Sequence, residues 1–368
     1  MLNHKKLKYI VLIMCYIMLT GFSYMTQKPM GHENITNEII EEFKKNSSDY
    51  VIIPYEVQKN IYLYNEYLEN YNKALENSKD TMYTDEYKDQ QFLQAQDYLL
   101  SANTLKNYVD NQDKIVKQLQ DKEVYHIVDK YLQCSVYVEQ ENYYEIQYQQ
   151  EVAELDILTS KYKLGYATRL EVLEKKAKLE ESKANIEICK LKLEQLEEEI
   201  KEQCALESFK IAEIDNSDLL LGYNDYINVY LQNYEYLNYD YTINAYNQYL
   251  TDISTKSSIS TNLIEKIKNQ IEITKLERSI YASNIKKYVK EEINQYKVAE
   301  QNLKSKKMEL KYIQSKLTQY TNLLEEGKIT PIEVARINTQ EALIESEIAS
   351  LYYSKLAIYY KLTYTVME

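Results

Sequence analysis

Two segments of the chain, 165–172 and 327–334, have closely matching sequences, GYATRLEV and GKITPIEV. Their glycines lie 162 residues apart, and the Gly, Thr, Glu and Val of the two segments fall at equivalent positions. A match of this kind, continued by the flanking sequence at the same spacing, is the signature of an internal duplication. The chain is therefore expected to consist of two copies of one structural unit.

Each matching segment has the residue order of a tight turn between two helices. The glycine ends one helix, because glycine adopts the left-handed backbone conformation without strain. The threonine caps the next helix, and the glutamate three residues later completes a capping box. A proline occupies the first helical position of the second copy. These tip residues are Gly165, Thr168, Glu171, Gly327, Thr330, Pro331 and Glu333.

Apolar residues recur every seven positions on both sides of each turn. In the second copy, the row before the turn is unbroken: Val289, Tyr296, Leu303, Leu310, Leu317 and Leu324. The matching row of the first copy has one polar residue, Glu141, among Ile127, Cys134, Tyr148, Leu155 and Tyr162. The row after the first turn is Val172, Leu179, Ile186, Leu193 and Ile200. Seven-residue spacing predicts a left-handed coiled coil, so each copy is expected to be a long antiparallel helical hairpin.

The composition favours the same fold. Only eight of 368 residues are Gly or Pro, which leaves few turns for so long a chain. We therefore predict an all-α protein of two tandem long antiparallel coiled-coil helical hairpins. The first repeat is expected at 54–205, beginning at Pro54 and with its tip near 165. The second is expected at 223–368 with its tip near 327–331, after a linker at 206–222.

The N-terminus has the features of an export signal. Lys5, Lys6 and Lys8 precede an apolar run at 10–22, which is shorter than the roughly 20 residues needed to span a bilayer. We interpret 1–23 as a signal peptide, with an N-terminal membrane anchor as the alternative, and 24–53 as a leader or linker. The mature protein is expected outside the cytoplasm, secreted or attached to the cell envelope.

Forty tyrosines are an unusual feature of the chain, and several follow helical spacing. Tyr223, Tyr226, Tyr230 and Tyr234 fall on one stripe of a helix. This stripe is either core or subunit packing with the hydroxyls reaching water, or an aromatic surface for cell-wall glycans or another protein. Loss of stability after replacing Tyr226 and Tyr230 by Ala would favour the first interpretation.

The sequence contains no recognisable catalytic, metal-binding or cofactor-binding pattern. The histidines, His4, His32 and His126, lack ligand spacing, and His126 is expected to be an exposed helix residue. Outside the expected signal segment, which contains Cys15, three cysteines remain. Cys134 and Cys189 are expected to be small buried residues, Cys204 has no assigned role, and an odd set of three predicts no disulfide framework. A net charge of −13 argues against a nucleic-acid partner. We expect neither an enzyme nor a cofactor.

The first turn and its flanks resemble a motif of the TolC-type outer membrane efflux protein family, Tyr-x-x-Gly-x-x-Thr/Ser-x-x-Glu-Val-Leu. Residues 162–173 match it fully, whereas the second copy lacks the Tyr and the final Leu. The resemblance implies a homotrimer whose twelve helices form a hollow cylinder. It also implies that the tips contact an HlyD/MacA-like adaptor coupled to an ABC transporter. The tip residues are the only positions to which a possible adaptor contact can be assigned.

The chain departs from that family between the upstream and ascending helices of each repeat. A membrane-spanning strand needs roughly 9–11 residues of alternating polarity, and the connections at 78–89 and 251–261 are too short and polar for a hairpin of two. We therefore expect no transmembrane β-barrel, as in a relative from a bacterium with a single membrane. Membrane contact is expected only through an uncleaved N-terminal segment. The expected function is a part of an export assembly; the alternative is a structural coiled-coil protein of the envelope.

Overall fold

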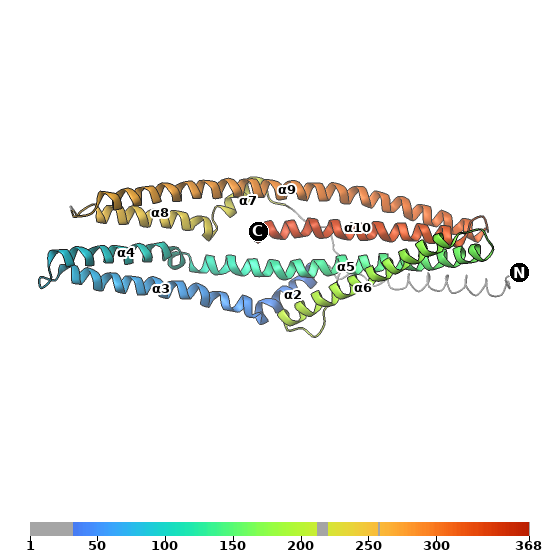
Figure 1. Cartoon of the computed structure of the whole chain (residues 1–368), viewed down its shortest axis with the longest axis horizontal. Coiled ribbons are helices and arrows are strands. Elements are labelled where there is room, and N and C mark those ends of the chain that lie inside the picture. The colour runs from blue at the N-terminus through green and yellow to red at the C-terminus, as the bar shows by residue number, and fades with distance from the viewer. Residues whose placement is uncertain (1–31, 212–219, 257, 368) are drawn as a thin grey trace.

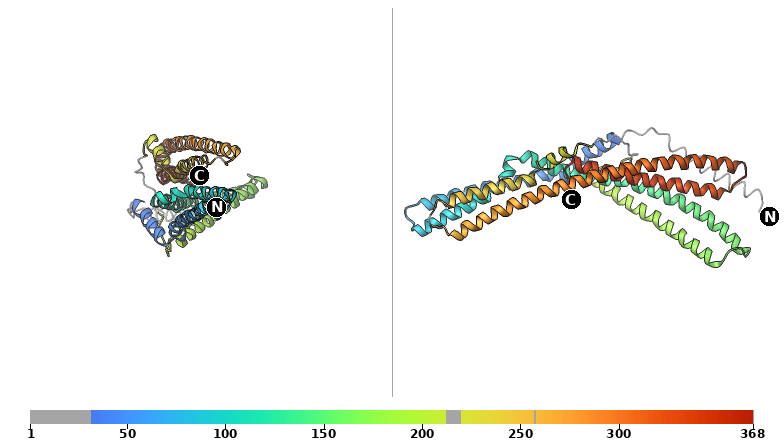
Figure 2. Two further views of the ribbon diagram at one scale, coloured as in Figure 1. Left: turned by 90° about the vertical axis from the view of Figure 1, so that its left-hand side faces the viewer. Right: turned by 90° about the horizontal axis from the view of Figure 1, so that it is seen from above.

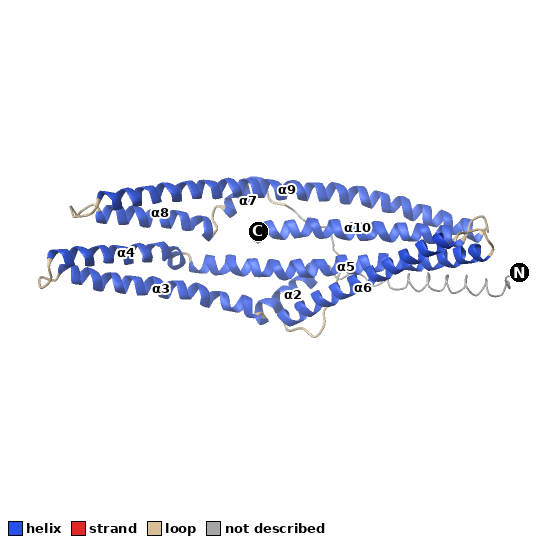
Figure 3. Cartoon of the chain, viewed as in Figure 1, coloured by secondary structure: helices blue, strands red, loops and turns tan. Residues whose placement is uncertain are grey.

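A computed structural model describes residues 32–211, 220–256 and 258–367. Within these ranges the regular secondary structure is entirely helical, as the all-α expectation required, with loops as the only other conformation (Figure 3). None of the described helices is both long and apolar enough to cross a bilayer. The signal segment expected at 1–23 lies outside the described residues.

The first repeat is built from five helices. Helices α2 (His32–Asn46) and α3 (Ser48–Lys79) lead to a loop, which is followed by α4 (Asp85–Asp110). Helix α5 (Gln112–Lys163) then runs to the first tip, and α6 (Arg169–Cys204) returns from it. The tip of this hairpin lies at the predicted place.

The second repeat follows the same plan with four helices. Helices α7 (Tyr223–Tyr230) and α8 (Tyr234–Ile253) form its upstream part. Helix α9 (Thr261–Glu325) is a single helix of 65 residues, about 100 Å long at 1.5 Å per residue. After the second tip, α10 (Pro331–Thr363) returns along it. The two predicted tandem hairpins are thus α5–α6 and α9–α10.

The molecule is long and narrow, and both predicted tips lie at the same end (Figure 1). In that half, adjacent helices contact one another in the order α6, α5, α10 and α9. In the other half the order is α3, α4, α8 and α9, so α9 alone runs through both halves. Seen from above, the tip of α5–α6 lies apart from the tip of α9–α10 (Figure 2).

The hydrophobic core lies near the middle of the molecule, where both halves meet. One cluster joins α2 to α5, α6 and α10 through residues that include Phe43, Ile127, Ile200 and Leu356. A second joins α7 to α9 and α10 and includes Tyr230 and Val289. Smaller clusters lie between α8 and α9 and between α9 and α10. Most of the fully buried large side chains are therefore far from the tips.

Part of the segment 24–53, expected to be a leader or linker, is helical in the structure. Helix α2 buries Ile39, Ile40 and Phe43 against α5 and α6, so tertiary packing stabilises a segment with weak local signals. Helix α3 begins at Ser48 rather than at Pro54, because the Ser47 hydroxyl accepts a hydrogen bond from the Tyr50 amide. Pro54 lies inside the helix and removes one backbone donor there.

The predicted seven-residue rows are followed better in the second repeat than in the first. In the rows after the turns, Val334 of α10 is buried, whereas the equivalent Val172 of α6 is only partly covered, as are Leu179 and Leu193. Helix α10 packs between α9 and α5 and is covered on both sides, whereas α6 lies at the edge of the layer. Position within the layer therefore decides how deeply each row is buried.

Candidate functional site: the hairpin tips

Both tip glycines adopt the left-handed backbone conformation that the sequence predicts. Gly165 has a φ of +79° and Gly327 a φ of +70°. At the first tip, the Tyr166 amide donates to the Lys161 carbonyl at 2.8 Å and the Gly165 amide to the Tyr162 carbonyl at 3.0 Å. This pair of hydrogen bonds is a Schellman motif, which satisfies carbonyl groups at the end of α5.

The second tip has the same hydrogen bonds. The Lys328 amide donates to the Leu323 carbonyl at 2.9 Å, and the Gly327 amide donates to the Leu324 carbonyl at 2.9 Å. Nothing lies within 4 Å of a Cβ atom built at either glycine. The requirement for glycine therefore comes from the backbone conformation alone, since there is no close neighbour to exclude a side chain.

The threonines and glutamates at the tips cap the returning helices. The Thr168 backbone amide donates to Glu171 Oε2 at 2.6 Å, and the Glu171 amide donates back to Thr168 Oγ1 at 3.2 Å. In the second tip, the Thr330 amide and hydroxyl both donate to Glu333 Oε2 at 2.8 Å. There the Glu333 amide donates to the Thr330 backbone carbonyl at 3.1 Å. Pro331 occupies the first helical position, as predicted.

These caps have an electrostatic consequence for the two glutamates. The hydrogen bond from the Thr168 amide, followed by that from its hydroxyl, lowers the pKa of the Glu171 carboxyl below its ordinary value. The Thr330 amide and hydroxyl lower the pKa of Glu333 in the same way. Both carboxylates therefore stay ionised in mildly acidic solution, at helix N-termini where negative charge is favourable.

Behind the tips, Glu154 joins three helices at one point. Its Oε1 atom accepts a hydrogen bond from Arg336 Nε of α10 at 2.9 Å, and its Oε2 atom lies 2.5 Å from Lys175 Nζ of α6. Burial raises the pKa of this carboxyl, but the hydrogen bonds from Lys175, Arg336 and Gln150 outweigh it and lower the pKa to about 2. The seven-residue rows of apolar residues did not predict this contact, because it depends on the packing of α5 against α10.

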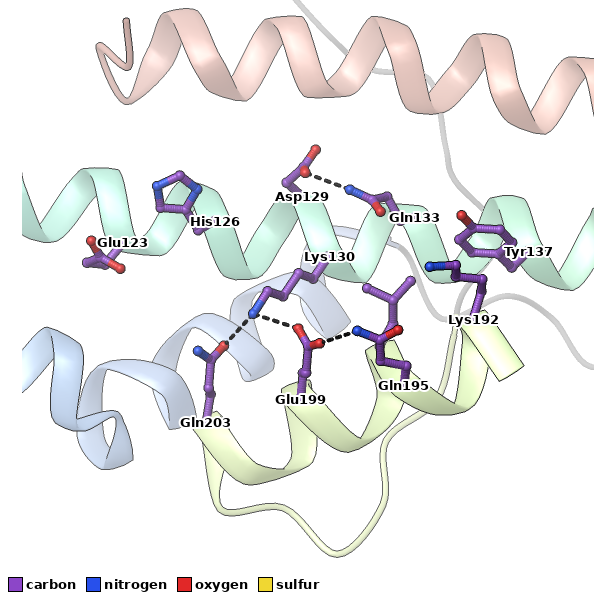
Figure 4. A pocket seen from close by; sticks show the side chains of 11 residues that line it. Glu123, His126, Asp129, Lys130, Gln133, Tyr137, Lys192, Gln195, Glu199 and Gln203 are labelled. Carbon is purple, nitrogen blue, oxygen red and sulfur yellow. Dashed lines mark hydrogen bonds and ion pairs between the residues drawn. The ribbon is translucent and has the colours of Figure 1, made fainter. Parts of the chain in front are cut away.

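A polar pocket of about 500 Å³ lies between α5 and α6 near the middle of the molecule (Figure 4). Lys130 Nζ lies 3.0 Å from Glu199 Oε2 and donates to Gln203 Oε1 at 3.3 Å. Gln195 donates to the same glutamate at 2.9 Å. These groups bind one another across the two helices, so they hold the base of the hairpin together. His126, expected to be exposed, is half-buried at the rim.

The remaining candidate residues do not gather at the tips. Cys134 and Cys189 are buried free thiols, as predicted, and Cys204, for which the sequence suggested no role, is buried as well. Tyr226 and Tyr230 are buried in the core, which favours packing over an aromatic surface for them, whereas Tyr223 is exposed. Among the described residues, no cluster of His, Cys, Asp or Glu has an arrangement that could hold a metal ion.

Comparison with known proteins identifies the fold. No protein-family model matches the sequence, and no curated protein matches it either. Solved structures do match. The outer membrane channel CmeC of Campylobacter jejuni has a TM-score of 0.58 and 10% identity, covering 89% of this chain and 84% of that one. The outer membrane protein VceC of Vibrio cholerae has a TM-score of 0.56 and 11% identity, covering 88% and 95%.

A third match is the outer membrane channel MtrE of Neisseria gonorrhoeae, with a TM-score of 0.55 and 10% identity, covering 90% of this chain and 89% of that one. These matches extend over nearly the whole of both chains. The resemblance to TolC-type channels is therefore confirmed for the fold. Sequence identity this low shows the fold alone.

Proposed function

We propose that this chain is an extracytoplasmic, TolC-like component of an export assembly and has no enzymatic activity of its own. The observation that carries the proposal is the match to outer membrane channels over 84–95% of their length, which includes both hairpins. The two tips lie at one end of the molecule, exposed and rigidly capped. They are the surfaces best placed to contact an HlyD/MacA-like adaptor, which would connect the chain to an ABC transporter.

The proposed assembly is a homo-oligomer, and family resemblance suggests a trimer. The four-helix layer has two uncovered edges, α9 on one side and α3 with α6 on the other. Both edges expose apolar side chains, which include Leu276, Ile280, Met308 and Tyr312 on α9 and Tyr55, Tyr62, Ile188 and Leu191 on the opposite edge. Joining unlike edges of successive copies would cover both and close a ring.

Cross-linking in cells tests the adaptor contact. Single cysteines replace Tyr166 at the first tip or Lys328 at the second, in a background with Cys15→Ser. The three remaining native cysteines are buried. We expect at least one tip variant to capture an adaptor-like protein encoded with an ABC transporter. The matched control is Met82→Cys, an exposed position in the loop at the opposite end. Capture from Met82→Cys alone, or from none of the three, would contradict the proposal.

Light scattering with small-angle scattering on the mature chain tests the oligomer. An elongated trimer agrees with the proposed assembly. An elongated monomer at all concentrations would instead favour a structural spacer of the cell envelope. Leu191→Glu and Met308→Glu place a charge on opposite uncovered edges, and each is expected to shift a trimer towards monomer.

A further inference from the structure

The first tip exposes apolar side chains that the second tip lacks. Leu164, Tyr166 and Leu170 are 71%, 82% and 74% exposed, and Tyr162 is 45% exposed. The equivalent positions of the second tip hold two half-buried apolar residues and two charged ones, in the order Leu324, Glu326, Lys328 and Ile332. The two tips share their backbone hydrogen bonds, so this difference in surface requires an explanation other than folding.

The two tips also differ in charge. Residues 161–170 include Lys161, Lys163 and Arg169 and no acidic residue, although the whole chain has a net charge of −13. The equivalent residues 323–332 include two glutamates and one lysine. With the capping glutamates Glu171 and Glu333 included, residues 161–171 hold three basic and one acidic residue, and residues 323–333 hold one basic and three acidic residues. Positive charge is therefore concentrated at the one tip that also exposes tyrosine and leucine.

Leucine and tyrosine beside lysine and arginine are the residues that peripheral proteins place at a membrane surface. Tyrosine prefers the interface between lipid and water, and each basic residue near an anionic surface contributes about 1 kcal/mol to binding. The first tip lies apart from the second (Figure 2), and a single loop is sufficient for shallow insertion between headgroups.

We propose that the tip of α5–α6 docks onto the outer surface of an anionic phospholipid bilayer. Leu164 and Tyr166 enter the interface, and Lys161, Lys163 and Arg169 contact the headgroup phosphates. The inference goes beyond the proposed function, because it separates the two tips and leaves the adaptor contact to the second tip and the flanks of the hairpins.

The backbone of the first tip is suited to such an environment. Polar backbone groups must be satisfied internally where water is scarce. The amides of Leu164, Gly165 and Tyr166 donate to carbonyls of α5, and that of Thr168 donates to Glu171. These four amides of the turn are therefore already hydrogen-bonded within the chain, and the two helices hold the turn at the end of the molecule.

The chain contains no tryptophan, so a single introduced tryptophan reports on its own position. Tyr166→Trp in the full chain is mixed with vesicles of phosphatidylcholine containing roughly one third phosphatidylglycerol, an anionic lipid of the kind that attracts basic segments. We expect its emission to shift to shorter wavelength. The matched control is Lys328→Trp, the equivalent position of the second tip, for which no shift is expected. Vesicles of phosphatidylcholine alone should give a weak shift or none.

A second variant tests the role of charge. In the Tyr166→Trp background, Lys161, Lys163 and Arg169 are changed together to Gln. The lipid concentration that gives half of the emission shift should then rise roughly a hundredfold, given the contribution of each basic residue. Circular dichroism checks that both proteins remain helical. Because the signal is local, vesicle binding through the N-terminus alone leaves both tryptophans unshifted.

Three results would overturn the inference. These are no shift for Tyr166→Trp, equal shifts at both tips, and a shift unaffected by loss of the three charges. Capture of an adaptor by a cysteine at 166, combined with no response to vesicles, would assign this tip to a protein partner instead. That result would support the proposed function while rejecting the membrane contact, so the two can fail separately.

Discussion

Arg336 Nε of α10 lies 2.9 Å from Glu154 Oε1 of α5, and this ion pair joins the two hairpins near their tips. The side chain of Arg336 is 57% exposed and that of Glu154 is 19% exposed. Solvent therefore screens the arginine more than the carboxylate. Lys175 of α6 binds the other carboxylate oxygen, so one glutamate connects both helices of its own hairpin to the second hairpin.

Removal of this ion pair is expected to weaken the contact between the hairpins. Arg336→Met should lower the free energy of unfolding by about 1 kcal/mol, since the pair is partly exposed. Urea denaturation of Arg336→Met, Glu154→Gln and the double variant completes a double-mutant cycle, which gives the coupling free energy between the two residues. Lys178→Met with Glu174→Gln, an exposed pair within α6, serves as the control. Equal coupling in both pairs would contradict a joining role for Glu154.

The same glutamate predicts how stability depends on pH. Its folded pKa of about 2 lies below the ordinary value of 4.5. The stabilisation is therefore fully present above the unfolded value and is lost as pH falls through the folded one. Between about pH 4.5 and pH 2, wild-type protein should lose more stability than Glu154→Gln does. Chemical denaturation at a series of pH values measures this difference. Equal losses of unfolding free energy in wild type and Glu154→Gln would show that Glu154 does not cause the pH dependence.

The tip glycines should be sensitive to any side chain. Gly165→Ala and Gly327→Ala each force a non-glycine residue into the left-handed region, and each should cost about 1 kcal/mol. Gly165→Asn should cost less than Gly165→Ala, because asparagine tolerates this conformation better. Thermal or urea unfolding gives the comparison. Since no atom surrounds either position, a much larger loss would point to a contact that the isolated chain lacks.

The two threonine caps are expected to differ in strength. The Glu171 amide donates to Thr168 Oγ1 at 3.2 Å, whereas the Glu333 amide donates to the Thr330 backbone carbonyl at 3.1 Å. Thr168→Ala should therefore lower stability by about 1 kcal/mol, and Thr330→Ala by less, because Pro331 already favours the helix start. Thr168→Ser, which keeps the acceptor, is the control. A larger effect at Thr330 would contradict this difference between the caps.

The tyrosines of the core can be separated from those of the surface. Tyr230 is buried, and its hydroxyl donates to the Lys361 carbonyl at 3.3 Å or the Val366 carbonyl at 3.2 Å. Tyr230→Phe should cost about 1 kcal/mol, and Tyr230→Ala about 3–5 kcal/mol. Tyr83→Ala, at an exposed position of the loop between α3 and α4, is the control and should change the free energy of unfolding little. Intact stability in Tyr230→Ala would reject the packing role.

The tips could be predicted from sequence to the residue, whereas much of the middle could not. A turn of the Gly-x-x-Thr-x-x-Glu type is determined by local chemistry, and Gly165 and Thr168 play the expected parts. The break between α4 and α5 at Asn111 has no such signature. There the Asn111 side chain donates to the Asn107 side chain and to the Tyr241 hydroxyl of α8, so the break depends on a helix distant in sequence.

The exposed apolar surface of the first tip was also not predicted by the sequence patterns. The seven-residue rows identified Tyr162 as a seam residue, yet it is 45% exposed. Periodicity shows which residues share a face of a helix, but it does not show whether another helix covers that face. At the end of a hairpin there is no further turn to cover it. The exposure of Tyr162 and Leu164 therefore became visible only with the three-dimensional structure.

The two repeats differ in mechanical continuity. Helix α9 runs without interruption from Thr261 to Glu325, so a twist applied at the second tip is carried through its backbone hydrogen bonds to the opposite end. The corresponding path in the first repeat crosses the joint at Asn111, where the backbone leaves helical geometry with a φ of −127° and a ψ of 27°. One side of the molecule is thus a stiff rod and the other a jointed one. We therefore expect a load on the second tip to pass along one continuous helix, and a load on the first tip to pass through the single non-helical residue Asn111.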